Sequence, residues 1–142
     1  MGRPIQIDFD CAEPERLAAF WAEVLAYRVA DPPGGHATWA DISAAEAKEP
    51  GEAWCAAFDP DGKGPRILFH RVPEAKIAKN RVHLDVWVAP RGGDPDANWP
   101  AVDAEVERLI ALGASKIRRV SEDDQCFVVM ADPEGNEFCV CG

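Results

Sequence analysis

The pattern of residues in the first half of this chain recurs in the second half, and this repeat limits the fold more than any other feature. Each half opens with alternating apolar and polar residues typical of a strand, IQIDFD at 5–10 and RVHLDVWV at 81–88. Matching turns precede the last strand of each half, DPDG at 59–62 and DPEG at 132–135. A repeat of about 60 to 75 residues is too long for most solenoid units and indicates a duplicated βαβββ module.

Both halves are predicted to carry a helix followed by three strands. Helices are expected at 14–26 and near 101–112, because apolar residues recur there at helical spacing. The remaining strands are expected near 36–41, 52–58 and 65–71 in the first half, and near 115–120, 125–131 and 136–141 in the second. The chain is therefore predicted to be a single α+β domain over 1–142, with modules at 1–78 and 79–142.

Strand alternation places side chains that can bind a ligand or a metal on one face of each predicted sheet. In the second module His83, Asp85 and Trp87 share a face, and Gln6 occupies the matching place in the first module. The closing strands add Arg66, Leu68 and His70 to the first face, and Glu137, Cys139 and Cys141 to the second. With helices on the outer, aliphatic faces, we expect curved mixed sheets around a cup lined by the polar faces.

Composition and charge exclude several classes of function. A net charge of −10 argues against a nucleic-acid partner, because phosphate binding needs a basic surface. No stretch approaches a membrane span and no signal peptide is evident, so a cytoplasmic protein without membrane contact is expected. The odd count of five cysteines fits reduced core thiols better than disulfides or a zinc site.

The chain resembles the vicinal oxygen chelate superfamily, which includes glyoxalase I, extradiol dioxygenases and bleomycin-resistance proteins. The resemblance is closest to glyoxalase-like domains, and it rests on CAEPERLAAFWAEVLAYRV, RVHLDV and ADPEGNEFCV. It implies metal ligands on the first and last strands of the modules, which fall on His83, Glu137 and Gln6. The fourth position falls near Leu68, where glyoxalase I-like enzymes carry a carboxylate, with His70 two residues further on.

Two functions remain open from the sequence. In the first, one divalent ion (Zn, Ni, Fe or Mn) at His83, Glu137 and Gln6 chelates substrate oxygens, and Glu137 or Asp85 moves a proton. The protein would then be a lyase, an isomerase or a dioxygenase. In the second, the cup binds a drug or metabolite without metal or catalysis, as bleomycin-resistance proteins do. Leu68 favours the second function, and the His83 and Glu137 pair favours the first.

The tryptophans bear on the ligand. Trp39, Trp54 and Trp87 lie on predicted strands, and together with His70 and Leu68 they are the candidates for substrate binding. Indoles in a cup predict an aromatic or apolar small molecule, whereas the alternative is ordinary core packing. The family resemblance also implies a homodimer.

Overall fold

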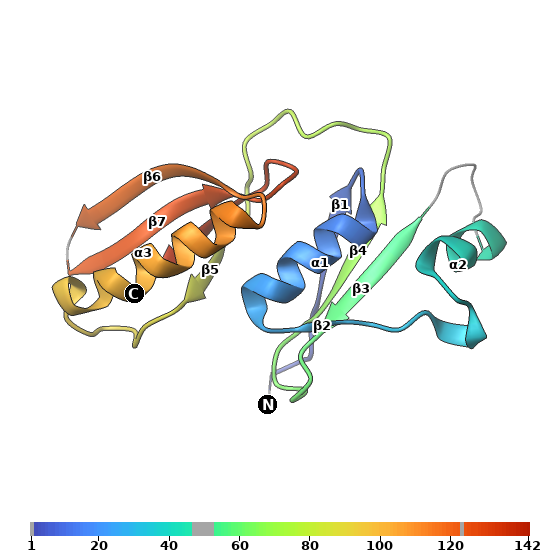
Figure 1. The fold of residues 1–142 in the computed structure, drawn as a ribbon, viewed down its shortest axis with the longest axis horizontal. Coiled ribbons are helices and arrows are strands. Elements are labelled where there is room, and N and C mark those ends of the chain that lie inside the picture. Colours follow the sequence, from blue (N-terminus) through green and yellow to red (C-terminus); the bar gives the residue numbers. More distant parts are fainter. Residues whose placement is uncertain (1, 47–52, 123) are drawn as a thin grey trace. The chain divides into compact units, whose positions relative to one another are not determined.

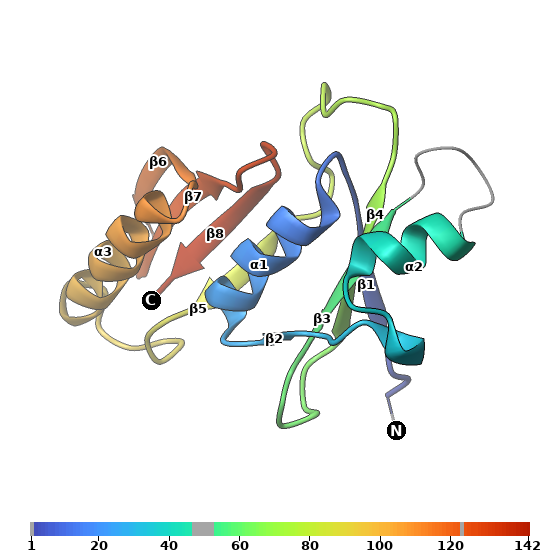
Figure 2. The ribbon, with the colours of Figure 1, turned by 45° about the vertical axis from the view of Figure 1, so that its right-hand side comes forward.

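The computed structural model describes residues 2–46, 53–122 and 124–142. The chain divides into two compact units, Met1–Ala75 and Lys76–Gly142, and each contains a four-stranded mixed sheet. In both units a helix near the start packs along one face of the sheet, α1 in the first and α3 in the second (Figures 1 and 2). The predicted α+β class and the two tandem βαβββ modules are confirmed.

The first unit has the strand order β1-β4-β3-β2, in which β1 is parallel to β4 and the other pairs are antiparallel. Its strands are β1 (Gln6–Cys11), β2 (Arg28–Val29), β3 (Trp54–Phe58) and β4 (Arg66–Arg71). Its helices are α1 (Pro14–Leu25), the short 3₁₀ helix η1 (Pro33–Gly35) and α2 (Trp39–Glu46).

Helix α1 forms where the apolar spacing predicts it. Pro14 suits the first turn because proline has no N–H to donate there. Leu17 and Trp21 are at most 1% exposed and belong to the core of this unit. The helix ends at Ala26, which takes a left-handed conformation with φ of 54° and donates its N–H to the carbonyl of Ala22. Glycine normally occupies such a position, so the turn is built at a cost in backbone strain.

The strand predicted at 36–41 is wrong, because helix α2 begins at Trp39. Thr38 and Asp41 cap each other: the Asp41 N–H donates to Thr38 Oγ1 at 3.2 Å, and the Thr38 N–H donates to Asp41 Oδ2 at 3.0 Å. This reciprocal pair is a capping box, which stabilises a helix start. The two-residue strand β2 pairs with β3 in place of the predicted strand. Residue 52, at the start of the next predicted strand, lies outside the described residues.

The second unit has the strand order β5-β8-β7-β6, with β5 parallel to β8 and the other pairs antiparallel. Its elements are β5 (Leu84–Trp87), α3 (Pro95–Ala111), β6 (Ser115–Glu122), β7 (Gln125–Ala131) and β8 (Glu137–Cys141). Within the described residues no helix is long and apolar enough to cross a membrane.

Two predicted boundaries in the second unit are wrong. Helix α3 begins at Pro95, six residues before the predicted start, because Asp94 caps it by accepting from the N–H of Asp96 at 3.1 Å. The Gly, Pro and Asp content of this segment suggested a loop. Strand β5 covers only residues 84–87 of the predicted 81–88, so His83 directly precedes it.

The repeated turns fold alike in the two units. The Asp59 carboxylate accepts from the N–H groups of Asp61 and Gly64, and the Asp132 carboxylate accepts from those of Glu134 and Asn136. In each unit the first residue of the turn, an aspartate, accepts hydrogen bonds from N–H groups of the turn and of the residues that lead into the next strand. These turns therefore fix where β4 and β8 begin.

Candidate functional site

One face of the second sheet packs against α3, and the other face carries the predicted site residues. Arg119 lies opposite Val128 in the β6–β7 register, and its guanidinium is 3.4 Å from the ring centroid of Trp99 in α3. Val128 shares a face with Arg119 and therefore lies on the face that packs against α3. Its neighbours along β7, Phe127 and Val129, lie on the opposite face. In register across three strands the residues of this opposite face are Asp85, Trp87, Glu137, Cys139, Cys141, Phe127, Val129 and Ala131.

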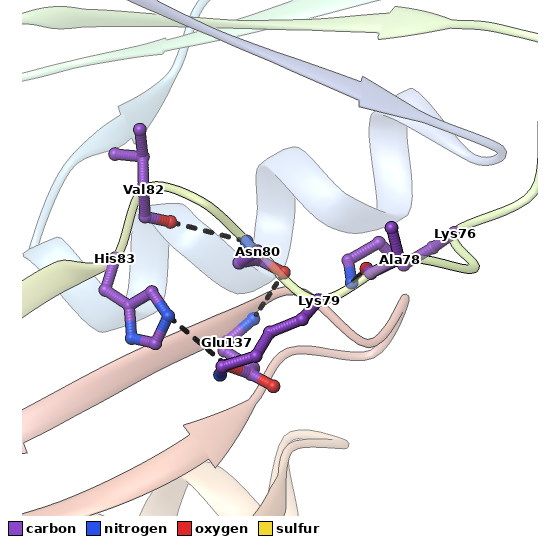
Figure 3. Close-up of polar contacts among 7 residues, drawn as sticks. All are labelled: Lys76, Ala78, Lys79, Asn80, Val82, His83 and Glu137. Atoms are coloured by element: carbon purple, nitrogen blue, oxygen red, sulfur yellow. Dashed lines mark hydrogen bonds and ion pairs between the residues drawn. The ribbon is translucent and has the colours of Figure 1, made fainter.

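His83 and Glu137 meet at the start of the two parallel strands on this face. His83 Nε2 lies 3.2 Å from Glu137 Oε2 (Figure 3). The ammonium of Lys79 donates to the same oxygen, and the Glu137 N–H donates to Asn80 Oδ1 at 3.2 Å. The His83 and Glu137 side chains are 32% and 20% exposed. The pair is therefore held from two sides and still open to a small ligand.

Glu137 is an ionised carboxylate at neutral pH. The hydrogen bond from Lys79 is the main cause that lowers its pKa, and electrostatic interactions with Lys79, His83 and Lys76 act in the same direction. Partial desolvation opposes them. A carboxylate beside an imidazole nitrogen can bind a cation or accept a proton from a ligand.

The two side chains fit a divalent metal ion as an incomplete ligand set. An imidazole nitrogen and a carboxylate oxygen are ligands that zinc, iron and manganese accept, and open positions suit substrate or water. Over residues 2–46, 53–122 and 124–142, no group of three or more His, Cys, Asp or Glu side chains is placed to hold a metal. His83 and Glu137 would thus supply two ligands from the second unit.

The neighbouring cysteines do not extend this ligand set. All five cysteines are buried and form no disulfide, as expected of core thiols. Burial and the nearby Asp85 carboxylate raise the pKa of Cys139 to about 11 and that of Cys141 to about 12. Both thiols are therefore protonated at neutral pH, and within the described residues neither belongs to a group of three or more candidate metal ligands.

Asp85 lies next to His83 on the same face. It is opposite Cys139 in the β5–β8 register, and the Cys139 thiol hydrogen-bonds to its carboxylate. Two residues along a strand separate it from His83, which is about 6.6 Å. Asp85 is exposed and can meet a ligand that lies along β5.

The first unit gathers the other predicted residues on one face of its own sheet. The register sets Gln6 opposite Arg66, and His70 opposite both Asp10 and Trp54. Arg66 donates to Gln6 Oε1 at 2.6 Å, and Gln6 Nε2 donates to Asp8 Oδ1 at 2.8 Å. The amide of Gln6 is therefore engaged on both its oxygen and its nitrogen.

Arg66 was predicted to lie on this face, but the sequence analysis gave it no role in the site. The fourth ligand position was expected near Leu68, but Leu68 lies opposite Asp8, and Arg66 is the residue opposite Gln6. Glu137 comes two residues after the glycine of its turn, whereas Arg66 comes four residues after Gly62. The segment between the turn glycine and the strand face is thus two residues longer in the first module, and this difference in length was the signal in the sequence. A guanidinium thus stands where the second module has a carboxylate.

The three tryptophans proposed for the ligand differ in their surroundings. Trp39 is 7% exposed, its indole N–H donates to the Ala30 carbonyl at 2.7 Å, and its ring packs against Trp54 with 4.6 Å between centroids. Trp87 is 42% exposed, with the Arg91 guanidinium 5.3 Å from its ring centroid. Only Trp87 lies on the same face as His83 and Glu137 within the second unit.

Comparisons with known proteins agree on the type of domain. A family model described as a glyoxalase-like domain matches residues 6–141. A search of curated proteins gives no match.

Several solved structures resemble the whole chain. Fosfomycin resistance protein FosX from Listeria monocytogenes, a mutant in complex with Mn(II) and 1S,2S-dihydroxypropylphosphonic acid, has 11% identity and a TM-score of 0.66 over 100% of this chain and 92% of its own. FosX from Mesorhizobium loti has 13% identity and a TM-score of 0.64, covering 99% and 91%. A glyoxalase/bleomycin resistance protein/dioxygenase family enzyme from Burkholderia phytofirmans has 16% identity and a TM-score of 0.63, covering 96% and 94%. At these identities the likeness shows the fold alone.

Proposed function

This chain belongs to the glyoxalase-like domain family of the vicinal oxygen chelate superfamily, and from that premise we propose that it binds a small molecule beside His83 and Glu137, together with a divalent metal ion. The observation that carries the proposal is the 3.2 Å contact between His83 Nε2 and Glu137 Oε2, on a sheet face that α3 leaves uncovered. The lowered pKa of Glu137 supports it, because an ionised carboxylate is the form that binds a cation.

His83 and Glu137 would hold the ion, and Gln6 remains a predicted third ligand. The similarity to a FosX structure that contains Mn(II) supports a metal of the Mn, Fe, Ni or Zn group. A bound divalent ion would polarise two adjacent oxygens of the ligand. Asp85, next along β5, is the residue that we propose as the acceptor of a ligand proton. Such a transfer suits a lyase or an isomerase, and a dioxygenase would need O₂ as a second substrate as well.

A second candidate function is ligand binding without metal or catalysis. Two contacts favour it: the Lys79 ammonium donates to the Glu137 oxygen that a cation would need, and Arg66 donates to the Gln6 oxygen. Each side chain that the resemblance implies as an oxygen ligand thus has a cationic partner within its own unit. In this function the same residues would bind the polar end of a ligand through hydrogen bonds.

Metal analysis of purified protein separates the two functions. The protein is stripped with chelator, incubated with Mn(II) or Zn(II), desalted, and measured by inductively coupled plasma mass spectrometry. We expect about one ion per chain in the wild type and none in His83→Ala or Glu137→Gln. His36→Ala, which removes a histidine from a loop of the first unit, is the matched control and should retain metal. A protein that binds small molecules but retains no ion would exclude the metal-dependent function in favour of the second.

A further inference from the structure

The face opposite α3 carries an aromatic row beyond the His83 and Glu137 pair. Trp87 on β5 lies opposite Cys141 on β8, and Cys141 lies opposite Phe127 on β7. A small side chain therefore stands between two large aromatic ones. One step nearer to His83, the corresponding residues are Asp85, Cys139 and Val129.

The spacing of this row suits one planar ring. Neighbouring strands are about 4.8 Å apart, so the Cα atoms of Trp87 and Phe127 are separated by roughly 10 Å. A ring stacked between two aromatic side chains needs about 7 Å, since carbon atoms in contact are about 3.5 Å apart on each side. Cys141 is 5% exposed, so the side chains around it must turn aside before a ring can lie over it.

The chemistry of the row is apolar. Val129, Cys139 and Cys141 form a buried cluster against which Phe127 packs. Trp87 is 42% exposed, which leaves indole surface for a ligand.

We propose that Trp87 and Phe127 hold the flat, apolar end of the ligand, with its ring over Cys141. The row lies four residues along β5 from His83, a distance of about 13 Å. This inference rests on the proposed function for the polar end of the ligand. It narrows the ligand to an extended molecule about as long as two aromatic rings. Its adjacent oxygens would lie at His83 and Glu137, and its middle beside Asp85.

A series of hydroxamates tests the row, since each carries two adjacent oxygens on a body of different length. Binding of acetohydroxamate, benzohydroxamate and 4-phenylbenzohydroxamate to Mn(II)-loaded protein is measured by calorimetry. We expect affinity to rise by about tenfold or more along the series, because the longer bodies reach the aromatic row. Trp87→Ala and Phe127→Leu should remove this gain and leave acetohydroxamate unchanged, whereas Trp87→Phe should keep most of it.

Two controls make the result specific. Leu112→Ala removes a side chain that is also 42% exposed but lies at the end of α3, and it should not alter the series. Biphenyl-4-carboxamide, which lacks the adjacent oxygens, is measured with metal-free protein and should bind in a manner that depends on Trp87. Thermal unfolding of every variant checks that it folds.

The outcomes separate this inference from the proposed function. If no hydroxamate binds while biphenyl-4-carboxamide binds and requires Trp87, the metal function fails and the aromatic row stands. If biphenyl-4-carboxamide does not bind, or if the gain along the series survives in both Trp87→Ala and Phe127→Leu, the aromatic row is overturned.

Discussion

At the scale of single residues, Glu137 Oε2 has two competing partners, the imidazole of His83 and the ammonium of Lys79. The Lys79 side chain is 67% exposed, so its ion pair with Glu137 is screened by water and contributes little on its own. A divalent ion that displaces this ammonium would gain a ligand and lose only a weak contact. We therefore expect Lys79 to lower the affinity for a metal ion without preventing its binding.

Lys79→Ala is expected to raise the affinity for Mn(II) by roughly two- to fivefold, because it removes a competing cation from Glu137. Calorimetric titration of metal-free protein measures the effect. Lys63→Ala is the control, since Lys63 makes a comparable exposed ion pair with Asp61 in the first unit. A fall in affinity would mean instead that Lys79 positions the Glu137 carboxylate for the metal.

Asp59 provides a prediction about pH. Hydrogen bonds from the N–H groups of Asp61 and Gly64 are the main causes that lower its pKa below the ordinary 3.8. Desolvation raises the pKa by less than these two bonds lower it, and the N–H and charge of Lys63 lower it further. A carboxyl with a lowered folded-state pKa stabilises the fold at pH above its unfolded pKa, and this contribution is lost as pH falls through the folded pKa.

We therefore expect Asp59→Asn to flatten the loss of stability on acidification. Urea unfolding between about pH 5 and pH 2 should show a shallower decline than in the wild type. Asp61→Asn is the control, because its carboxylate is 70% exposed. Equal slopes for the Asp59 variant and the wild type would show that the turn does not depend on the ionised carboxylate.

Residue-level prediction from the sequence succeeded where strand alternation decided the geometry. Alternation predicted that His83 and Glu137 share a face, and the structure brings them into contact. It did not predict Lys79, because the partner of a long exposed side chain depends on tertiary placement and not on periodicity. The role of His83 and Glu137 as metal ligands stays a prediction. The roles of Gln6, Leu68, His70 and the tryptophans stay predictions as well.

At the scale of helices and strands, the errors arose where capping residues competed with composition. HATWAD suggested a strand through its aromatic and β-branched residues, but Thr38 and Asp41 form a capping box that begins α2. PRGGDPDANWP suggested a loop through its glycines and prolines, yet Asp94 and Pro95 are favourable residues for a helix start. The long strands β6, β7 and β8 were predicted within a few residues, because their alternation is regular.

Ala26 allows a test of element geometry. Its φ of 54° is unfavourable for any residue with a Cβ, so Ala26→Gly should stabilise the protein by about 0.5 to 1 kcal/mol. Chemical denaturation measures the change. The same substitution at Ala104, exposed inside α3, should destabilise it by about 1 kcal/mol, because glycine lowers helix propensity. Destabilisation at both positions would mean that Ala26 makes contacts that outweigh its strain.

At the scale of the whole molecule, the repeat has diverged in chemistry while it keeps its topology. Both units order their strands in the same way, with the first strand parallel to the last. In the second unit the paired strand starts carry His83 and Glu137, and in the first they carry Gln6 and Arg66. An imidazole and a carboxylate suit a cation, whereas a guanidinium repels one. We therefore expect the second unit to dominate metal binding.

Hydrogen exchange with and without Mn(II) tests this division between the units. Binding to the native state stabilises it by about 2.7 kcal/mol when free metal is one hundred times the dissociation constant. We expect the added protection on β5 and β8, at the strands that carry or adjoin His83 and Glu137, and none in His83→Ala. Added protection on β1 as well would identify Gln6 as a ligand, and protection confined to β1 and β4 would contradict the assignment to the second unit.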